Sequence, residues 1–143
     1  GFVFISVRKG VRFMHGNAFD WGKTSQDYGK FRDIYPPLFY QKIVERNCGT
    51  AGQEVLDIGT GTGVLPRNMY RFGAHWTGID IAPNQIAEAK RLSAGMEISY
   101  LVSPAEELDF AGKQFDCITA CQCYWYFDNQ KAAPVFARLL KPH

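Results

Sequence analysis

Three glycines at alternate positions, Gly59, Gly61 and Gly63, follow an apolar run that contains the acid Asp57. Glycine allows a sharp turn out of a strand, lets a ligand approach the backbone, and lets the next helix pack close to the sheet. Asp80 ends the next apolar segment, where a carboxylate can accept both ribose hydroxyls of an adenosine. The pattern indicates an adenosine cofactor site; the alternatives are a plain glycine-rich turn and, for Asp80, a helix N-cap or solvated turn residue.

The glycine spacing narrows the choice of cofactor. A nicotinamide fingerprint is G-x-G-x-x-G, whereas residues 59–63 read G-x-G-x-G, and no lysine follows as it does in a phosphate-binding loop. Asp57 would repel a pyrophosphate but attract an ammonium or sulfonium group. The site therefore favours the cationic ligand S-adenosylmethionine, and a nicotinamide-dependent oxidoreductase is the remote alternative.

Strand-like and helix-like segments alternate around this loop. A first helix should begin at Pro36-Pro37 and end at Gly49 in a left-handed cap. Periodicity then predicts strands at 54–58, 75–79, 98–102 and 115–120, and helices at 64–72, 84–93 and 129–140. The alternation predicts an α/β fold, a doubly wound and mostly parallel sheet with helices on both faces, in which ligands bind at the carboxyl ends of the strands.

Composition and charge limit the class of protein. The 143 residues are 46% hydrophobic, which suits one domain with a buried core. No apolar stretch is long enough for a membrane span and no secretory signal is recognisable, so we expect a cytoplasmic protein without a membrane partner. The net charge is +2 without a basic stripe, which makes a nucleic-acid partner unlikely.

The cysteines and histidines form no recognisable site. We expect Cys48, Cys117, Cys121 and Cys123 to be small buried apolar residues rather than disulfide partners or metal ligands. The pair at 121 and 123 lacks the usual zinc spacing, so no metal site is expected. The three histidines are scattered, and the catalytic residues stay unknown.

Several segments resemble one family. Residues 54–63, EVLDIGTGTG, resemble motif I of the class I S-adenosylmethionine-dependent methyltransferases, and residues 78–81 resemble their second-strand motif. Residues 103–110 are similar to the loop that flanks the adenine, 114–119 to the fourth strand, and 139–142 to the turn before the fifth. The similarity extends over about 19–143 and is greatest for the small-molecule enzymes related to quinone biosynthesis.

The resemblance implies methyl transfer from S-adenosylmethionine to an unidentified small-molecule acceptor, leaving S-adenosylhomocysteine. Pattern and resemblance together assign these residues to the cofactor site: Tyr28, Arg32, Asp57, Gly59, Thr60, Gly61, Gly63, Asp80, Ile81, Ala105, Glu106 and Gln122. For Tyr28 the alternative is plain core, for Arg32 a surface arginine, and for Glu106 a solvated turn residue. Pro104 departs from the family, where many relatives have an aspartate before the alanine of the adenine loop. Gln122 and aromatic residues 124–126 are expected to face the acceptor, with core packing the alternative for the aromatics.

The two ends of the chain also carry expectations. Residues 1–18 are expected to be an N-terminal extension of the 19–143 domain, with a flanking strand as the alternative. The resemblance implies the strand order 3-2-1-4-5-7-6, and the sequence stops before the fifth strand. The fourth strand is therefore expected to be an exposed edge, open to self-association, in a fragment whose alternative function is non-catalytic S-adenosylmethionine binding.

Overall fold

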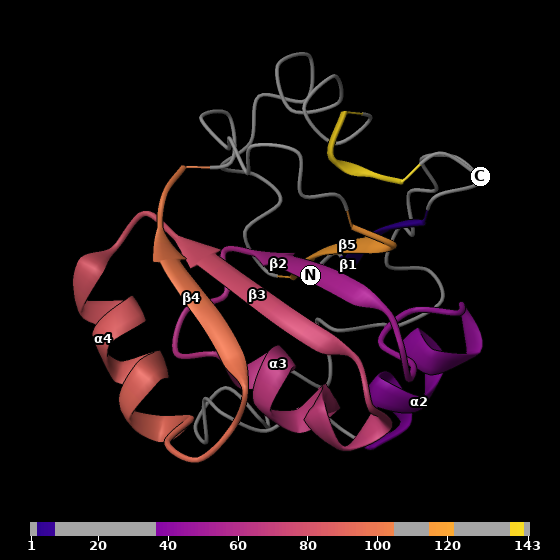
Figure 1. The fold of residues 1–143 in the computed structure, drawn as a ribbon, viewed down its shortest axis with the longest axis horizontal. Coiled ribbons are helices and arrows are strands. Elements are labelled where there is room, and N and C mark those ends of the chain that lie inside the picture. Colours follow the sequence, from indigo (N-terminus) through magenta and orange to yellow (C-terminus); the bar gives the residue numbers. More distant parts are fainter. Residues whose placement is uncertain (1–2, 8–36, 105–114, 122–137, 142–143) are drawn as a thin grey trace.

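The computed structural model describes residues 3–7, 37–104, 115–121 and 138–141, which contain a five-stranded sheet (Figure 1). The strand order is β1-β5-β2-β3-β4. The strands span Val3–Val7 (β1), Glu54–Ile58 (β2), His75–Asp80 (β3), Ile98–Val102 (β4) and Cys117–Cys121 (β5). β5, β2, β3 and β4 pair in parallel, and their order is the one that the resemblance implied for the first four strands of the family. The prediction of a mostly parallel, Rossmann-like sheet is confirmed.

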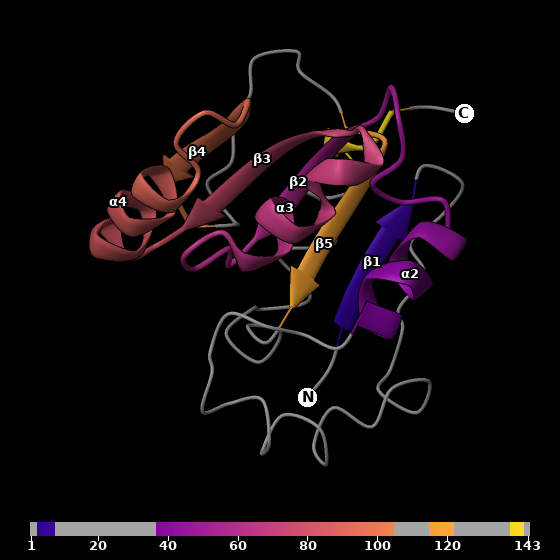
Figure 2. The ribbon, with the colours of Figure 1, turned by 90° about the horizontal axis from the view of Figure 1, so that it is seen from below.

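Three α-helices and one short 3-10 helix are described, and the α-helices cover one face of the sheet (Figure 2). They span Pro37–Glu45 (α2), Val64–Met69 (α3), Tyr70–Phe72 (η1) and Pro83–Leu92 (α4). Most of the helix predicted at 129–140 lies outside the described residues, with only Arg138 and Leu139 seen as helical. None of the helices in the described ranges is both long and apolar enough to cross a membrane.

One hydrophobic core cluster lies between these helices and the sheet. Phe39 and Ile43 of α2 and Met69 of α3 pack in one cluster with Trp76 of β3, each at most 1% exposed. A Cβ at Gly49 would lie 2.7 Å from the Met69 Cε atom and 3.1 Å from a Trp76 ring carbon. The chain after α2 therefore passes so close to the core that a side chain at this position would displace it.

The expected end of the first helix was slightly wrong. α2 ends at Glu45, and Asn47 takes the first left-handed conformation after it, with φ 60°. The Asn47 amide donates to the Val44 carbonyl at 2.9 Å, as in a helix C-cap. Asparagine is one of the few residues that adopts this conformation at low cost. Gly49, also left-handed at φ 84°, serves the close packing described above instead.

The expectation of an exposed fourth-strand edge was wrong. β1 pairs with β5 in antiparallel register, from Val3 opposite Cys121 to Val7 opposite Cys117. Residues 3–7 thus belong to the sheet, as in the flanking-strand alternative, and the pairing fills the backbone edge of β5. No local pattern indicates this pairing, because the two partner strands lie near opposite ends of the chain.

A disulfide joins Cys48, just after α2, to Cys117 at the start of β5. Both residues are fully buried in the same apolar cluster, as expected, but the expectation of unpaired thiols was wrong for these two. Burial in one cluster brings together two cysteines that are 69 residues apart in sequence. The covalent ring formed by this bond includes β2, α3, η1, β3, α4 and β4.

Replacing both cysteines, as Cys48→Ala with Cys117→Ala, should lower the free energy of unfolding by about 2–5 kcal/mol, because the unfolded chain loses its cross-link. Urea unfolding monitored by circular dichroism measures this change. Reduction of the unsubstituted protein should produce a loss of similar size and should not destabilise the double variant further. Equal stability of the oxidised protein and the double variant would show that the cross-link contributes nothing.

Candidate functional site

The glycine loop leaves the carboxyl end of β2 and leads into α3. Gly59, Gly61 and Gly63 all have positive φ values, of 67°, 59° and 81°. Glycine adopts this conformation at the lowest cost, so the backbone shape alone favours glycine at each of the three positions. The Thr60 amide donates to the Ile79 carbonyl at 2.8 Å, which attaches the loop to the neighbouring strand β3.

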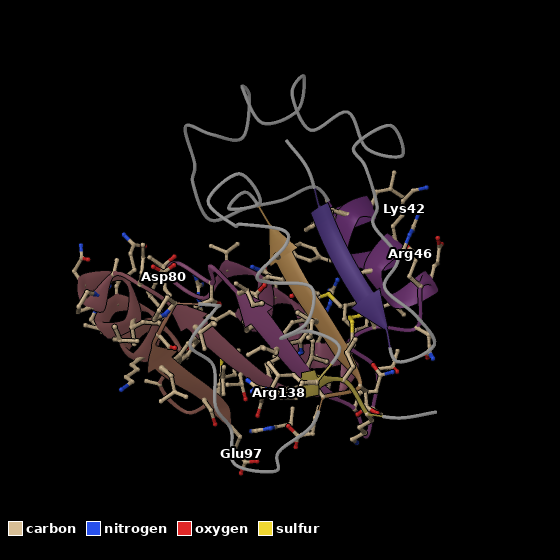
Figure 3. All side chains as sticks on the ribbon, turned by 90° about the horizontal axis from the view of Figure 1, so that it is seen from above. Lys42, Arg46, Asp80, Glu97 and Arg138 are labelled. Carbon is tan, nitrogen blue, oxygen red and sulfur yellow. A yellow bond between two sulfur atoms is a disulfide. The ribbon has the colours of Figure 1, made fainter. Side chains whose placement is uncertain are left out.

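Asp80 is the last residue of β3 and lies near α4 (Figure 3). Its Oδ2 atom accepts a hydrogen bond from the Gly61 amide and its Oδ1 atom one from the Ala82 amide, both at 2.9 Å. The Ala82 contact is the local turn role that the sequence offered as an alternative. A carboxylate has about four acceptor positions, so Asp80 can hold the loop and still accept hydroxyl groups of a ligand.

Four residues stand side by side across the sheet beneath this loop. Thr119 of β5 is opposite Asp57 of β2, Asp57 is opposite Gly78 of β3, and Gly78 is opposite Tyr100 of β4. We call this set the floor row. Residues that face each other in parallel strands point to the same side of a sheet, so the floor row shares one face. Tyr100 packs with Ile86 of α4, which places that face on the helix side.

Asp57 is the charged member of the floor row, and only 3% of it is exposed. Burial raises the pKa of its carboxyl group from 3.8 to about 7, an effect that the Thr119 and Thr60 hydroxyls partly offset and the Asp80 charge increases. The Thr119 hydroxyl donates to Asp57 Oδ1 at 2.7 Å. A carboxyl with such a pKa changes its charge near neutral pH and would gain from a nearby cation.

The side of the loop at Gly61 is open among the described residues. A Cβ placed there would meet only Gln85 Oε1, at 3.6 Å. The carboxylate of Asp80 lies next to Gly61. The residue after Asp80 in the chain, Ile81, is 69% exposed. Three features thus lie next to one another: open backbone, a carboxylate and an exposed apolar side chain. Together they suit a ligand that carries hydroxyl groups and a flat apolar part.

The structure brings together seven of the predicted site residues: Asp57, Gly59, Thr60, Gly61, Gly63, Asp80 and Ile81. Thr60 is only 6% exposed and lies against Gly78, so its side chain faces the sheet. The other five, Tyr28, Arg32, Ala105, Glu106 and Gln122, lie outside the described residues, as do aromatic residues 124–126, and their roles stay predictions. Within the described ranges, no group of three or more His, Cys, Asp or Glu residues is placed to hold a metal ion.

Sequence reasoning missed three members of the floor row: Gly78, Tyr100 and Thr119. A Cβ at Gly78 would lie 2.7 Å from Thr60 Oγ1 and 2.9 Å from Tyr100 Cδ1, so this strand glycine makes room for both side chains. A glycine inside a buried strand signals close approach of another group, and that signal was present in the sequence. Tyr100 and Thr119 carry no such signal, because only strand register places them beside Asp57.

Comparison with known proteins shows which family this chain resembles. The model of a family described as "Methyltransferase domain" matches residues 55–143. Ubiquinone biosynthesis O-methyltransferases of Salmonella paratyphi A and Klebsiella pneumoniae are each 35% identical over 122 residues, which is 80% of this chain and 50% of theirs. The chain thus spans about half the length of the curated relatives it matches.

Solved structures share the arrangement of strands and helices. The YcgJ protein of Bacillus subtilis matches with a TM-score of 0.64 and 25% identity, over 71% of this chain and 45% of that one. The plantazolicin methyltransferase BamL, solved with S-adenosylhomocysteine and a triazolic desmethylPZN analogue, matches with a TM-score of 0.52 and 30% identity, over 62% of this chain and 34% of that one. The magnesium protoporphyrin IX methyltransferase of Synechocystis, solved with S-adenosylmethionine, shares the fold at 16% identity and a TM-score of 0.58, over 88% and 68%.

Asp57→Asn should make the protein more stable at pH 8 by up to about 4 kcal/mol. The folded pKa of about 7 lies above the ordinary value of 3.8, so the folded state holds the proton more tightly, and stability falls as pH rises between these values. The asparagine does not titrate, and its carbonyl can still accept from Thr119. Urea unfolding at pH 8 and pH 4.5 measures the difference, which should fall to about 1 kcal/mol at the lower pH, where the unfolded carboxyl is still mostly ionised but the folded one is not.

The exposed carboxylate of Glu97 supplies the control for this comparison. Glu97→Gln should change stability little at either pH, because an exposed charge is well solvated. A less stable Asp57→Asn variant at pH 8 would mean that hydrogen bonds fully compensate the buried charge, contrary to the prediction.

Proposed function

The chain belongs to the methyltransferase domain family, and we propose that it binds S-adenosylmethionine at the glycine loop and transfers the methyl group to an oxygen atom of a small-molecule acceptor. One observation carries this proposal. The Gly61 amide is bonded to Asp80 while the other side of Gly61 stays open, and the hydroxyl of the neighbouring Thr60 interacts with the buried carboxyl of Asp57 in the floor row. The carboxylate that can accept ribose hydroxyls (Asp80), the open loop backbone (Gly61) and the anionic group (Asp57) thus lie together at the carboxyl ends of adjacent strands.

The residues present fit the parts of S-adenosylmethionine. Asp80 has acceptor positions left for the two ribose hydroxyls. The exposed Ile81 offers an apolar surface to the adenine, and the open side of Gly61 accommodates the part of the ligand that follows the ribose. Asp57 supplies negative charge toward the positively charged end of the ligand. The same carboxylate would oppose the pyrophosphate of a nicotinamide cofactor.

The cofactor supplies an activated methyl group on a positively charged sulfur, so the demands on the protein are binding and alignment. The glycine loop and Asp80 fix the adenosine end. Fixing both reactants can contribute roughly 7–11 kcal/mol toward lowering the barrier without a residue acting on the leaving group. We therefore assign no general base among the described residues.

Support for the acceptor comes from the relatives. The curated proteins that are 35% identical over 122 residues are named O-methyltransferases of ubiquinone biosynthesis, which motivates an oxygen acceptor on a small molecule. The residues predicted to face the acceptor, Gln122 and those at 124–126, are tested by substitution once an acceptor is found. Transfer of a labelled methyl group to a panel of phenols tests the acceptor class.

A cytoplasmic location belongs to this proposal, and one observation counts against it. Disulfides such as Cys48–Cys117 are rare in the reducing cytosol. Free thiols are trapped in intact cells, and the peptides that contain the two cysteines are then analysed by mass spectrometry. The result shows whether the two cysteines are reduced or joined in the cell. A blocked, reduced pair supports the cytoplasm, and an intact disulfide supports an oxidising compartment.

Titration with S-adenosylhomocysteine in a calorimeter should show binding to this chain, and titration with NADH should show none. Asp80→Ala should weaken binding by about tenfold or more, since two ribose hydrogen bonds and the tether to Gly61 are lost. Gly61→Val should abolish binding because its side chain fills the approach path.

Gly95→Val is the matched control for the loop variant. Gly95 has φ 84°, and a Cβ there would meet nothing within 4 Å, so this substitution adds similar backbone strain away from the site. It should leave affinity intact in protein that remains folded. Unchanged affinity in both Asp80→Ala and Gly61→Val would refute the placement of the cofactor, and tight NADH binding would refute its identity.

Affinity for S-adenosylmethionine should rise by about tenfold between pH 6 and pH 8, because the cation favours the ionised form of Asp57, whose pKa in the free protein is about 7. S-adenosylhomocysteine, which lacks the sulfonium charge, should show a weaker dependence. Calorimetric titrations of both ligands at several pH values measure the effect. Asp57→Asn should bind S-adenosylmethionine weakly at every pH; an unaltered pH profile in this variant would show that another group titrates.

A further inference from the structure

Tyr100 lies between two glycines that belong to different parts of the site. A Cβ at Gly63, at the end of the loop, would lie 2.3 Å from the Tyr100 hydroxyl oxygen and 3.0 Å from Cζ. A Cβ at Gly78, on β3, would lie 2.9 Å from Tyr100 Cδ1 at the base of the same ring. One aromatic ring thus occupies the space that side chains would take at both glycines, and the loop rests on its hydroxyl end.

The hydroxyl end of this ring is itself fixed. The oxygen of Tyr100 lies 2.8 Å from Ser93 Oγ, and both residues are buried, at 6% and 5% exposure. Ser93 is the C-cap residue of α4, and its amide donates to the Ala89 carbonyl at 3.0 Å. The ring therefore joins the end of α4 to the end of the glycine loop through one hydrogen bond and one close contact.

The loop backbone at this contact leads directly to the ligand side. The Gly63 amide donates to the Thr60 carbonyl at 2.9 Å, and the Gly63 carbonyl accepts from the Arg67 amide in the first turn of α3, also at 2.9 Å. Thr60 is bonded through its amide to β3, and Gly61 through its amide to Asp80. A shift of Gly63 relative to the sheet would therefore disturb the hydrogen bonds that hold Thr60 and Gly61 in place.

We infer that Tyr100, held by Ser93, is a positioning residue that sets the height of the glycine loop above the sheet and so places Gly61 and Asp80 for the ligand. This inference rests on the proposed function of the same site. Tyr100 contacts no reacting atom in it; the residue acts through Gly63. Loss of the Tyr100 hydroxyl should therefore weaken ligand binding and increase local opening of the glycine loop, even under conditions in which all of the protein is folded.

A set of conservative variants tests this role. Tyr100→Phe and Ser93→Ala each remove one partner of the same hydrogen bond, and each should weaken S-adenosylhomocysteine binding roughly fivefold. The double variant should bind no more weakly than the single ones, since both changes remove one interaction. All titrations are made well below the unfolding temperature of each variant, measured in parallel, so that lost stability alone cannot lower the affinity.

A rescue experiment separates positioning from ordinary packing. Gly63→Ala places a methyl group against the Tyr100 hydroxyl, whereas in a Tyr100→Phe background the nearest ring atom is the carbon at 3.0 Å. The strain of the left-handed backbone is the same in both backgrounds and cancels from the comparison. Gly63→Ala should therefore impair affinity less in the Tyr100→Phe protein than in the unsubstituted one.

Amide hydrogen exchange provides a readout that needs no ligand. In Tyr100→Phe and Ser93→Ala, the hydrogen-bonded amides of Thr60, Gly61 and Gly63 should exchange several-fold faster, while those in the middle of β2 should be unchanged. Tyr70→Phe is the matched control, because the Tyr70 hydroxyl accepts from the Glu97 amide at 3.1 Å in an exposed position. It should alter neither loop exchange nor affinity.

The two proposals fail in different ways. If the unsubstituted protein binds neither S-adenosylmethionine nor S-adenosylhomocysteine, the proposed function is refuted, and loop exchange alone decides the role of Tyr100. If the ligand binds but Tyr100→Phe and Ser93→Ala leave both affinity and loop exchange unchanged, the positioning role is refuted. An equal effect of Gly63→Ala in the two backgrounds would likewise overturn it.

Discussion

The close approach of the glycine loop to strand β3 is the constraint on which the rest of the site depends. Thr60 and Tyr100 occupy the space where a side chain at Gly78 would lie. A Cβ atom at Gly78 would be 2.7 Å from Thr60 Oγ1 and 2.9 Å from Tyr100 Cδ1. That approach lets the Thr60 amide reach the Ile79 carbonyl and the Gly61 amide reach Asp80. A larger residue at position 78 would move the glycine loop away from Asp80, since packed interiors leave no room for an extra methyl group.

The floor row beneath the loop combines this packing with an unfavourable charge. Asp57 is buried next to a glycine and a threonine, and burial raises its pKa to about 7. A group kept at such a cost to stability at neutral pH is typical of a functional site, where a ligand provides the missing partner. The same residue thus links the stability of the protein to the charge of the ligand proposed for it.

The remainder of the sheet supports the site from a distance. β1 covers the outer edge of β5, and the disulfide between Cys48 and Cys117 attaches the segment after α2 to the start of that strand. β5 in turn carries Thr119, which donates to Asp57. Anything that shifts β5 would therefore act on the buried carboxyl through this hydrogen bond. The covalent ring limits such a shift, because its two ends lie in the apolar cluster under α2.

The sequence by itself determined the features that are encoded locally. The glycine loop, the acid at the end of β3 and the strands around residues 54–58, 75–80 and 98–102 were all predictable, because each depends on side-chain patterns within a few residues. The pairing of β1 with β5, the bond between two cysteines 69 residues apart and the place of Tyr100 under Gly63 were decided only by the tertiary structure. These features depend on which strands become neighbours and in which register. Register and long-range pairing are set by packing of the whole sheet, which no single segment of the sequence specifies.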